Sequence, residues 1–330
     1  MINLPKIELH CHLDGSVRVS TIIDIAKKEN IEIPSFKEEI VKKFIEVPKD
    51  CTSLNEYLKK FELPNKIMQS SYSLEKIAFE LLEDAASENI KYIEIRFAPQ
   101  LHTKGGLSFD QVIKSVLKGV KKAEEIYDIR GNLILGCMRN MSIKSGLEVV
   151  KEGNKFLNNG VVAIDLCGPE YEGFAYEYKE ITDLAKELGY EITIHAGEAA
   201  SAQNVIDAIN ILGATRIGHG VRIKDMKEAY DLVKEKKITL EMCPTSNVQT
   251  KAIDYFYNYP FYDFYKDNIK VCINTDNRTV SNINLTNEIS LISNEFKISL
   301  DDYNKIYINS IEASFADKST KIWLSSFIKK

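Results

Sequence analysis

The chain has 330 residues, 44% of them hydrophobic and 28% charged, with a formal net charge of −5 at pH 7, which excludes a disordered or collagen-like protein. Lysine plus arginine (43) nearly balances aspartate plus glutamate (48), so the composition gives no support to a nucleic-acid partner. The length suits one large α/β barrel, for which about 250 residues are typical and more than about 400 occur with insertions.

Membrane insertion and secretion are not expected either. No uncharged apolar run approaches the roughly 18 residues of a spanning helix, and the first residues lack a basic flank followed by an apolar core. The six cysteines form no CxxC pair, and most lie in or beside apolar runs. We therefore expect reduced thiols in a cytoplasmic protein, with a disulfide-bonded protein as the less favoured alternative.

Short β-rich runs alternate with longer amphipathic stretches along the chain. Most of these runs have apolar residues on both faces, which is typical of buried parallel strands. The predicted strands cover residues 6–10, 92–98, 133–138, 161–166, 191–195, 216–218, 238–243 and 270–274.

The stretches between them have helical spacing. The first, residues 17–30, follows Ser16, which we expect to be its N-cap. The others cover residues 74–89, 108–127, 147–157, 176–188, 204–212, 226–236 and 285–294. This alternation predicts βαβ units closed into a (β/α)8 barrel of the TIM type. An open doubly wound sheet is the alternative, although no GxGxxG follows the first run.

Two segments depart from the alternation. Residues 32–73 contain helical spacing at 36–44 and 54–61 but no good strand. We interpret them as a helical insertion after the first strand, on the face where barrel active sites lie, and thus as a lid or pocket wall. Residues 300–330 are predicted to form two further helices outside the barrel. We expect residues 1–330 to form a single domain.

Four of the five histidines lie at the predicted C-terminal ends of strands. His10 and His12 are two residues apart on a strand and therefore point to the same face. Together with His195 and His219 they favour a metal site, with zinc as a good candidate. Buried core histidines are the alternative interpretation. His102 falls in a loop.

Two carboxylates complete this candidate site. Asp276 follows the eighth strand, which a closed barrel places beside the first, so it is a candidate fourth ligand; capping the next helix is the alternative. Glu198, three residues after His195, could shuttle a proton or merely occupy the first turn of a helix. His219 could bind the metal, or orient and deprotonate the attacking water. The fourth strand ends without a lysine, so a single metal ion is favoured.

Six motifs, taken together, resemble the adenosine deaminases within the metal-dependent amidohydrolase barrels. They are PKIELHCHLDGS at 5–16, DLCGPE at 165–170, HAGE at 195–198, RIGHGVR at 216–222, CPTSN at 243–247 and NTD at 274–276. They occur in the family's order and span nearly the whole chain.

The resemblance implies a set of metal and catalytic residues. One zinc ion per chain would be held by His10, His12, His195 and Asp276. Glu198 would protonate the purine N1 atom. His219 would be the partner of the attacking water, with Asp276 also contacting that water.

The resemblance also implies contacts to the substrate. His12 and Asp14 would contact the nucleoside, with Asp14 at the ribose, and the backbone of Gly168 would donate to purine N3. The family commonly has a second aspartate facing purine N7, where this chain has Asn277. Arg278 then replaces the usual proline, which puts the N7 contact and the local turn in question.

The implied activity is zinc-dependent hydrolytic deamination of adenosine and 2′-deoxyadenosine, with a purine nucleoside and water as partners and neither nucleic acid nor membrane. The oligomeric state stays open. Rival functions are deamination of adenine, of a modified nucleoside or of AMP. Asp14 favours a ribose-bearing substrate, whereas Arg278 leaves a phosphate site open. A catalytically inactive, growth-factor-like barrel is disfavoured because every implied ligand is present.

Overall fold

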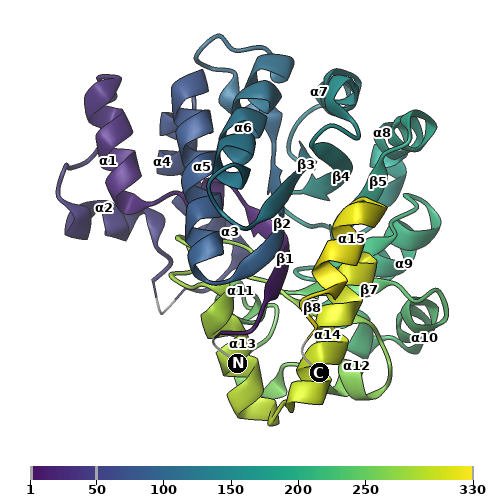
Figure 1. Cartoon of the computed structure of the whole chain (residues 1–330). Helices are drawn as coiled ribbons and strands as arrows, with labels where there is room; N and C mark the ends of the chain where they lie inside the picture. The colour runs from purple at the N-terminus through teal and green to yellow at the C-terminus, as the bar shows by residue number, and fades with distance from the viewer. Residues whose placement is uncertain (1–2, 49–50, 329–330) are drawn as a thin grey trace.

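The structure is a computed structural model that describes residues 3–48 and 51–328. Eight parallel strands follow one another in the order β1 to β8 around a barrel, and helices surround them (Figure 1). The strands are β1 (Lys6–His12), β2 (Ile90–Phe97), β3 (Arg130–Met138), β4 (Val161–Cys167), β5 (Glu191–Ala196), β6 (Arg216–His219), β7 (Thr239–Met242) and β8 (Val271–Ile273). This confirms the (β/α)8 prediction over the open doubly wound sheet.

The barrel closes through residues that follow the short strand β8. The Asp276 N–H donates to the His10 carbonyl at 2.8 Å, and the His12 N–H donates to the Asp276 carbonyl at 2.7 Å. The Asn274 side-chain oxygen accepts from the Leu9 N–H at 2.9 Å. Closure therefore places Asp276 directly beside the two histidines of β1.

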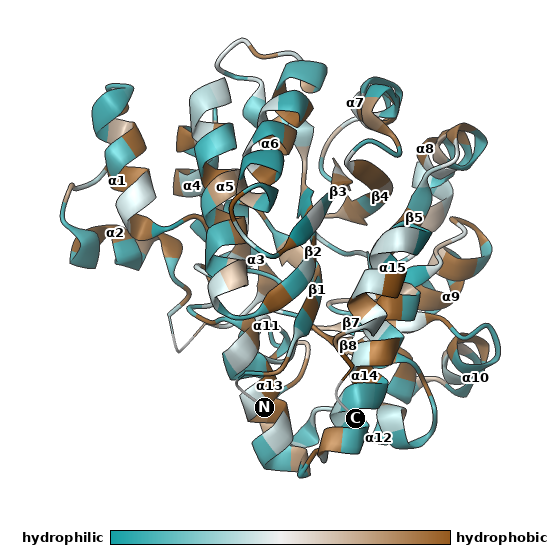
Figure 2. Cartoon of the chain, in the orientation of Figure 1, coloured by the Kyte–Doolittle hydropathy of each residue, from teal (hydrophilic) through white to brown (hydrophobic). Residues whose placement is uncertain are grey.

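Most of the surrounding helices have one buried and one exposed face. Figure 2 shows hydrophilic and hydrophobic residues mixed along them, as this placement requires. They are α1 (Val19–Lys28), α5 (Ser71–Ser87), α6 (Phe109–Glu124), α7 (Ile143–Gly153), α8 (Ala175–Leu188), α9 (Gln203–Asn210), α10 (Lys227–Glu235), α11 (Pro244–Gln249), α12 (Phe261–Lys266) and α13 (Leu285–Phe296).

The N-cap prediction for Ser16 is wrong. Ser16 ends a short 3-10 helix, η1 (Asp14–Ser16), and its hydroxyl donates to the His12 carbonyl at 2.7 Å. Helix α1 begins at Val19 behind Arg18, which makes no side-chain capping bond. The serine hydroxyl is used to hold the turn that follows β1 instead.

The insertion is helical, as predicted, within its described residues; residues 49 and 50 lie outside them. It contains α2 (Glu38–Ile45), α3 (Leu54–Leu58), η2 (Lys59–Phe61) and α4 (Glu62–Ile67). The Val47 N–H donates to the Val280 carbonyl at 2.8 Å, and the Tyr57 and Ser281 hydroxyls are 2.7 Å apart. These contacts fasten the insertion to the loop after β8.

The C-terminal segment crosses the N-terminal end of the barrel. It forms α14 (Leu300–Ala313) and α15 (Lys318–Ser325), as predicted for the described part of the tail; residues 329 and 330 lie outside it. Tyr303 donates to the Pro5 carbonyl at 2.7 Å, and the Phe315 N–H donates to Glu94 at 2.6 Å. Within the described residues, no helix is long and apolar enough to traverse a bilayer.

The interior of the barrel is charged, contrary to the expectation of apolar residues on both strand faces. Arg96 on β2 reaches across to Asp165 on β4 and to Glu241 on β7. Arg216 on β6 pairs with Glu94 on β2 at 2.6 Å. Because these strands are not neighbours, the pairs cross the interior and lie beneath the strand ends that carry the histidines.

Candidate active site

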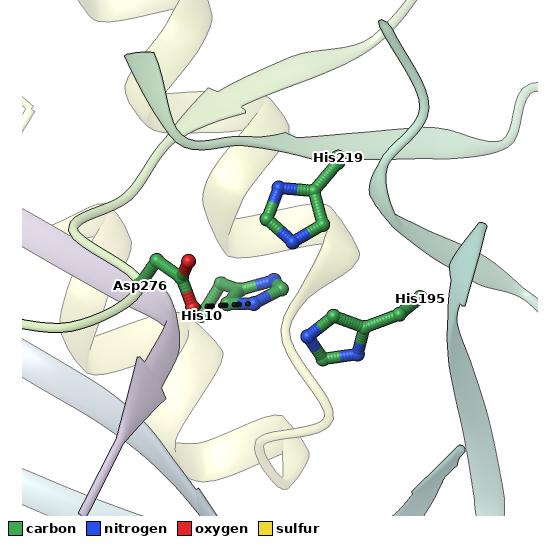
Figure 3. A group of neighbouring side chains, drawn as sticks. All are labelled: His10, His195, His219 and Asp276. Atoms are coloured by element: carbon green, nitrogen blue, oxygen red, sulfur yellow. Dashed lines mark ion pairs between the residues drawn. The ribbon is translucent and has the colours of Figure 1, made fainter. Parts of the chain in front are cut away.

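Three histidines and one aspartate meet at the C-terminal end of the barrel strands. His10 lies on β1, His195 on β5, His219 at the end of β6 and Asp276 after β8. One ligand atom from each of these buried side chains lies within 4.8 Å of the other three, and Figure 3 shows them gathered around one centre. His10 Nε2 is 3.3 Å from Asp276 Oδ1. The cluster offers the nitrogen and oxygen donors that suit zinc.

His12 joins this cluster from the side of the cavity. Its Nε2 atom is 3.2 Å from His195 Nε2 and 3.3 Å from Asp276 Oδ1. His10 and His12 thus reach the same Asp276 oxygen, which confirms that they point to one face of β1. Five groups now surround the centre, one more than a tetrahedral ion needs, so one of them is free for another task.

Buried carboxylates fix the rings of two of these histidines. His10 Nδ1 is 2.8 Å from Glu241, and His195 Nδ1 is 2.9 Å from Asp165. A carboxylate that accepts the Nδ1 proton leaves the Nε2 lone pair directed at the centre. Burial, reinforced by the charge of Arg96, lowers the pKa of His10 to about 4, so its ring is neutral at pH 7.

One buried atom lacks the partner that a metal would supply. His10 Nε2 is buried and makes no hydrogen bond among the described residues, and its neighbour Asp276 Oδ1, 3.3 Å away, is itself an acceptor. An uncompensated polar atom in such a place is costly unless an ion or donor meets it. The donor set and this orphaned nitrogen together fit a divalent metal ion.

Arginines keep the supporting carboxylates ionised. Arg96 donates to Asp165 at 2.9 Å and to Glu241 at 2.7 Å, and Arg216 Nε donates to Glu241 at 2.7 Å. Burial alone raises the pKa of Glu241, but Arg96 and Arg216 outweigh it and hold this pKa well below its ordinary value. The carboxylate can therefore accept the histidine proton at any pH near neutrality.

Asp276 and His219 both have left-handed backbone conformations, with φ of 63° and 64°. For residues other than glycine this conformation costs about 1–3 kcal/mol and persists where the surrounding structure enforces it. At Asp276 the hydrogen bonds to β1 enforce it. Ser246 donates to Asp276 Oδ2 at 2.6 Å, which leaves Oδ1 facing the histidines.

A chain of hydrogen bonds orients the ring of His219. The Tyr259 hydroxyl donates to Asn247 Oδ1 at 3.0 Å, and Asn247 Nδ2 donates to His219 Nδ1 at 2.9 Å. Because Nδ1 accepts, the neutral ring carries its proton on Nε2. That Nε2 atom is 3.6 Å from Glu198 Oε2. His219 is thus set to donate a hydrogen bond into the site.

Glu198 lies between His219 and the cavity. It is only 6% exposed, and its Oε1 atom accepts from the Thr250 hydroxyl at 2.9 Å. The Thr250 hydrogen bond therefore holds the carboxyl group at the cavity wall, with His219 Nε2 nearby on its other side. A carboxyl group so placed can exchange a proton with a bound molecule.

A cavity of about 410 Å³ opens above these groups. Its floor is lined by the predicted metal, substrate and catalytic residues His12, Asp14, Gly168, His195, His219, Asp276 and Asn277, and Glu198 lies in its wall. Part of its wall is apolar and comes from the insertion, through residues that include Leu54, Tyr57, Leu58 and Phe61. The volume and the mixture of an apolar wall with convergent polar groups are typical of a small-molecule site. His10 lies beneath the floor.

Three of the four predicted substrate contacts, Asp14, Gly168 and Asn277, line this floor together with His12. Burial raises the pKa of Asp14 to about 6, and its Oδ1 atom has no partner among the described residues. Gly168 has φ of 89°, a conformation that favours glycine. Asn277 packs on Gly15 so tightly that a Cβ atom added there would lie 1.9 Å from the amide oxygen. Gly15 therefore makes room for the Asn277 side chain.

The helix-end interpretations of the two carboxylates are wrong. Helix α9 begins at Gln203, so Glu198 is outside its first turn. Helix α13 begins at Leu285, and its N-cap is Asn284 rather than Asp276. Both carboxylates instead lie in the loops between strand and helix, which form the functional end of this fold.

Arg278 is directed away from the cavity. Its guanidinium forms a buried ion pair with Glu88, which also accepts from the Thr286 N–H at 2.9 Å. The cavity-lining residues within the described ranges include one lysine, Lys59, and no arginine. Arg278 thus gives no support to a phosphate site.

Several supporting residues are not among those that the sequence predicts for the site. Glu241, Asp165 and Arg96 fall within predicted strands or motifs, and the sequence assigns no role to Ser246, Thr250 and Asn247. One signal is present in the sequence: charged residues stand inside otherwise apolar runs, two of them in EIRF at 94–97 and one each in IDLC at 164–167 and LEMC at 240–243. Such residues are rarely fully buried unless they are paired, so they mark an internal network.

Comparisons with known proteins point to one family. The family model described as adenosine deaminase matches residues 5–330. A Clostridium botulinum (strain Okra) protein named adenosine deaminase is 58% identical over 327 residues, covering 99% of this chain and 98% of that protein. Among solved structures, an adenine deaminase from Arthrobacter aurescens superposes with a TM-score of 0.91 at 25% identity, covering 98% of each chain. The N6-methyl-AMP deaminase from Arabidopsis thaliana gives 0.87 at 29% identity, covering 98% of this chain and 96% of that one.

Proposed function

The chain belongs to the adenosine deaminase family, and from that premise we propose that its site converts adenosine and 2′-deoxyadenosine, with water, to inosine or 2′-deoxyinosine and ammonia. The observation that carries the proposal is the metal-type cluster at the floor of a nucleoside-sized cavity, with Glu198 in its wall. Purified protein should convert adenosine to inosine with release of one ammonia per nucleoside. A protein loaded with metal that leaves adenosine unchanged would contradict the proposal.

We propose one zinc ion per chain, held by His10, His12, His195 and Asp276. The contacts of His12 with both His195 and Asp276 support His12 as a ligand. The hydrogen bond from Asn247 places the ring proton of His219 on Nε2, which argues against His219 as a ligand. Zinc in this place would supply Lewis acidity that makes water a usable nucleophile near neutral pH. The remaining chemistry belongs to the side chains.

Proton transfer explains the placement of Glu198, His219 and Asp276. Attack of water at C6 breaks the aromaticity of the purine, so N1 has to accept a proton, which a protonated Glu198 at the cavity wall can donate. His219 Nε2–H donates a hydrogen bond that orients the attacking water. Because Nε2 carries the ring proton in this tautomer, His219 is better placed to orient the water than to remove a proton from it. The Asp276 carboxylate can accept the proton that the water loses. The C6–N bond then breaks, and the amine leaves as ammonia after a further proton transfer.

The rest of the cavity positions the nucleoside. We propose that His12 and Asp14 contact the sugar side, that the Gly168 N–H donates to N3, and that Asn277 donates its amide to N7. We also propose that residues 1–330 act as one domain in which residues 32–73 cover the bound substrate. The insertion's apolar wall supports this, since it faces the cavity.

The rival substrates find less support. Adenine and N6-methyl-AMP are the substrates in the names of two structural neighbours, at 25% and 29% identity, whereas the 58% identical relative is named for adenosine. The pairing of Arg278 with Glu88 removes the candidate phosphate ligand. The intact catalytic set disfavours an inactive binding protein.

We propose a nucleoside and water, rather than a nucleic acid, as the partners of this protein, and the cytoplasm as its compartment. All six cysteines are buried and free. Unpaired thiols are expected where the thiol pool is kept reduced. The balanced net charge of −5 gives no electrostatic reason to bind a polyanion.

Adenosine should be a much better substrate than free adenine. Asp14 presents a buried oxygen without a partner, which a ribose hydroxyl can satisfy and the free base cannot. Losing a hydrogen bond to a charged group lowers kcat/KM by about 10- to 100-fold. The measurement is kcat/KM for adenosine divided by kcat/KM for adenine. Asp14→Ala should lower this ratio. Equal values in the wild-type protein would favour adenine deamination.

Asn277→Ala should lower kcat/KM for adenosine by about 10-fold, because a buried hydrogen bond is lost and its partner is left unpaired. Purine N7 is an acceptor, and an amide donates at every pH, whereas a carboxylate donates only when protonated. Asn277→Asp should therefore stay active but below wild type. Steady-state kinetics of both variants test this, and an unimpaired Asn277→Ala would mean that the side chain never meets the substrate.

A further inference from the structure

The turn that carries Glu198 is held by a carboxylate from a different loop. Glu170, three residues after β4, accepts the backbone N–H groups of four successive residues: Gly197 at 2.7 Å, Glu198 at 2.9 Å, Ala199 at 2.8 Å and Ala200 at 3.1 Å. All four donors converge on one side chain. The turn lies between β5 and α9, so these amides have no helix or strand to satisfy them.

Glu170 is itself fixed in place. Its Oε1 atom also accepts from Asn204 Nδ2 at 2.9 Å, and Asn204, which is fully buried, donates to the Tyr171 carbonyl at 3.0 Å as well. Arg139 donates to the Gly168 carbonyl at 2.9 Å and to the His195 carbonyl. The charge of Arg139 and these hydrogen bonds outweigh burial and lower the pKa of Glu170, so it is an anion at pH 7.

The hydrogen bonds of Glu170 connect the loop after β4 with the turn after β5, and each of these segments carries a proposed site residue. Gly168, two residues before Glu170, is the proposed donor to purine N3, and Glu198 is the proposed acid at N1. The Glu198 side chain has one hydrogen bond of its own, from Thr250. Its direction therefore depends on where the turn holds its backbone.

We propose that Glu170 is a positioning residue that sets the distance between the N1 acid and the N3 donor by clamping the turn of residues 197–200. The proposal rests on the proposed function, since it assumes that Glu198 is the acid. Glu170 does not touch the substrate or the reacting atoms, and it does not line the cavity among the described residues.

Glu170→Gln separates positioning from mere packing. The amide keeps the size of the side chain but has one acceptor oxygen, and its NH₂ group would face N–H donors. A displacement of about 1 Å at a catalytic group can cost about 100-fold, so we expect kcat to fall by about 10- to 100-fold with KM changed by less than about 3-fold. Metal content should stay at the wild-type value.

Glu172→Gln is the matched control. Glu172 lies in the same loop and accepts from the next residue of the same turn, the Ser201 N–H and hydroxyl, both at 2.7 Å, but it is exposed. The Glu172→Gln variant should have a kcat within about 2-fold of wild type, as expected for a substitution at an exposed position. An equal loss of activity in both variants would mean that any disturbance of this loop suffices.

The deciding measurement is a double-mutant cycle with Glu198→Gln. If Glu170 acts through Glu198, adding Glu170→Gln to Glu198→Gln should cost less than about 2-fold more in kcat, because coupled residues are not additive. If kcat of the double variant instead falls by the product of the losses in the two single variants, the proposal is overturned. If Glu170→Gln does not fold, Glu170→Asp, which keeps the charge on a shorter side chain, takes its place in the same cycle.

A readout independent of turnover keeps the two proposals distinguishable. Backbone hydrogen exchange of residues 197–200 should be faster in Glu170→Gln than in wild type and unchanged in Glu172→Gln. Faster exchange in a protein that does not deaminate adenosine would support the clamp while contradicting the proposed function. Unchanged exchange would contradict the clamp itself.

Discussion

Glu198→Gln is expected to lose at least about 100-fold in kcat for adenosine, the low end of the contribution of a general acid. The amide keeps the volume of the side chain and can still accept from Thr250, but it has no acidic proton to give to N1. Fold and metal content should be unchanged because no proposed ligand is altered. Single-turnover kinetics together with metal analysis on the same preparation measure both.

A near wild-type rate in Glu198→Gln would remove Glu198 from the chemistry. Thr250→Val provides the matched comparison, since it removes the hydroxyl that orients Glu198 but leaves the acid. We expect it to lie between wild type and Glu198→Gln. A larger loss in Thr250→Val than in Glu198→Gln would mean that the threonine, rather than the acid, is what the reaction needs.

His12→Ala is expected to purify with greatly reduced zinc, because it removes a proposed ligand that approaches both His195 and Asp276 within about 3.3 Å. His219→Ala should retain zinc while losing activity, since its ring is engaged by Asn247 and faces Glu198. Metal content by mass spectrometry separates the two. Comparing the zinc content of the two variants shows whether His12 or His219 is the fourth ligand among the five nearby groups.

His102→Gln is the control for this pair. His102 is fully buried, yet it lies away from the cluster, and it was the histidine that fell outside the strand ends. It should keep a full complement of zinc. Retention of zinc by His12→Ala, or loss from His219→Ala, would reassign the ligand set to His10, His195, His219 and Asp276.

The sequence predicts the groups that face the cavity better than those that support them. The alternation of side chains along a strand predicts that His10 and His12 point to one face, and the structure confirms it. The closure of a barrel predicts that Asp276 lies beside them, as it does. Both inferences need only periodicity and fold class, which are properties of single segments and their order.

The hydrogen bonds and ion pairs that support these groups cannot be predicted from periodicity and fold class. The contacts of Arg96 with Asp165 and Glu241 join strands β2, β4 and β7, and which residues meet depends on the stagger of strands around the barrel. Local pattern does not encode that stagger. The Glu170 clamp is a further case, since its four backbone donors come from a loop 27 or more residues away.

Ser16 shows how a local rule fails. A serine before a helical stretch is a good N-cap, but this hydroxyl is used by the His12 carbonyl, and the turn that contains it brings Asp14 to the cavity. The tertiary requirement of the site overrides the local preference. The same holds for the left-handed backbone of Asp276 and His219, which the local sequence alone does not specify.

Zinc titration of metal-free protein, with adenosine deamination followed, tests the proposed metal site most directly. We expect chelated wild-type protein to lose activity, activity to return in proportion to zinc and to saturate at one equivalent per chain, and His12→Ala not to be restored by the same zinc concentration. Full deamination by protein shown to be free of metal, or saturation at two equivalents, would contradict the proposed metal site.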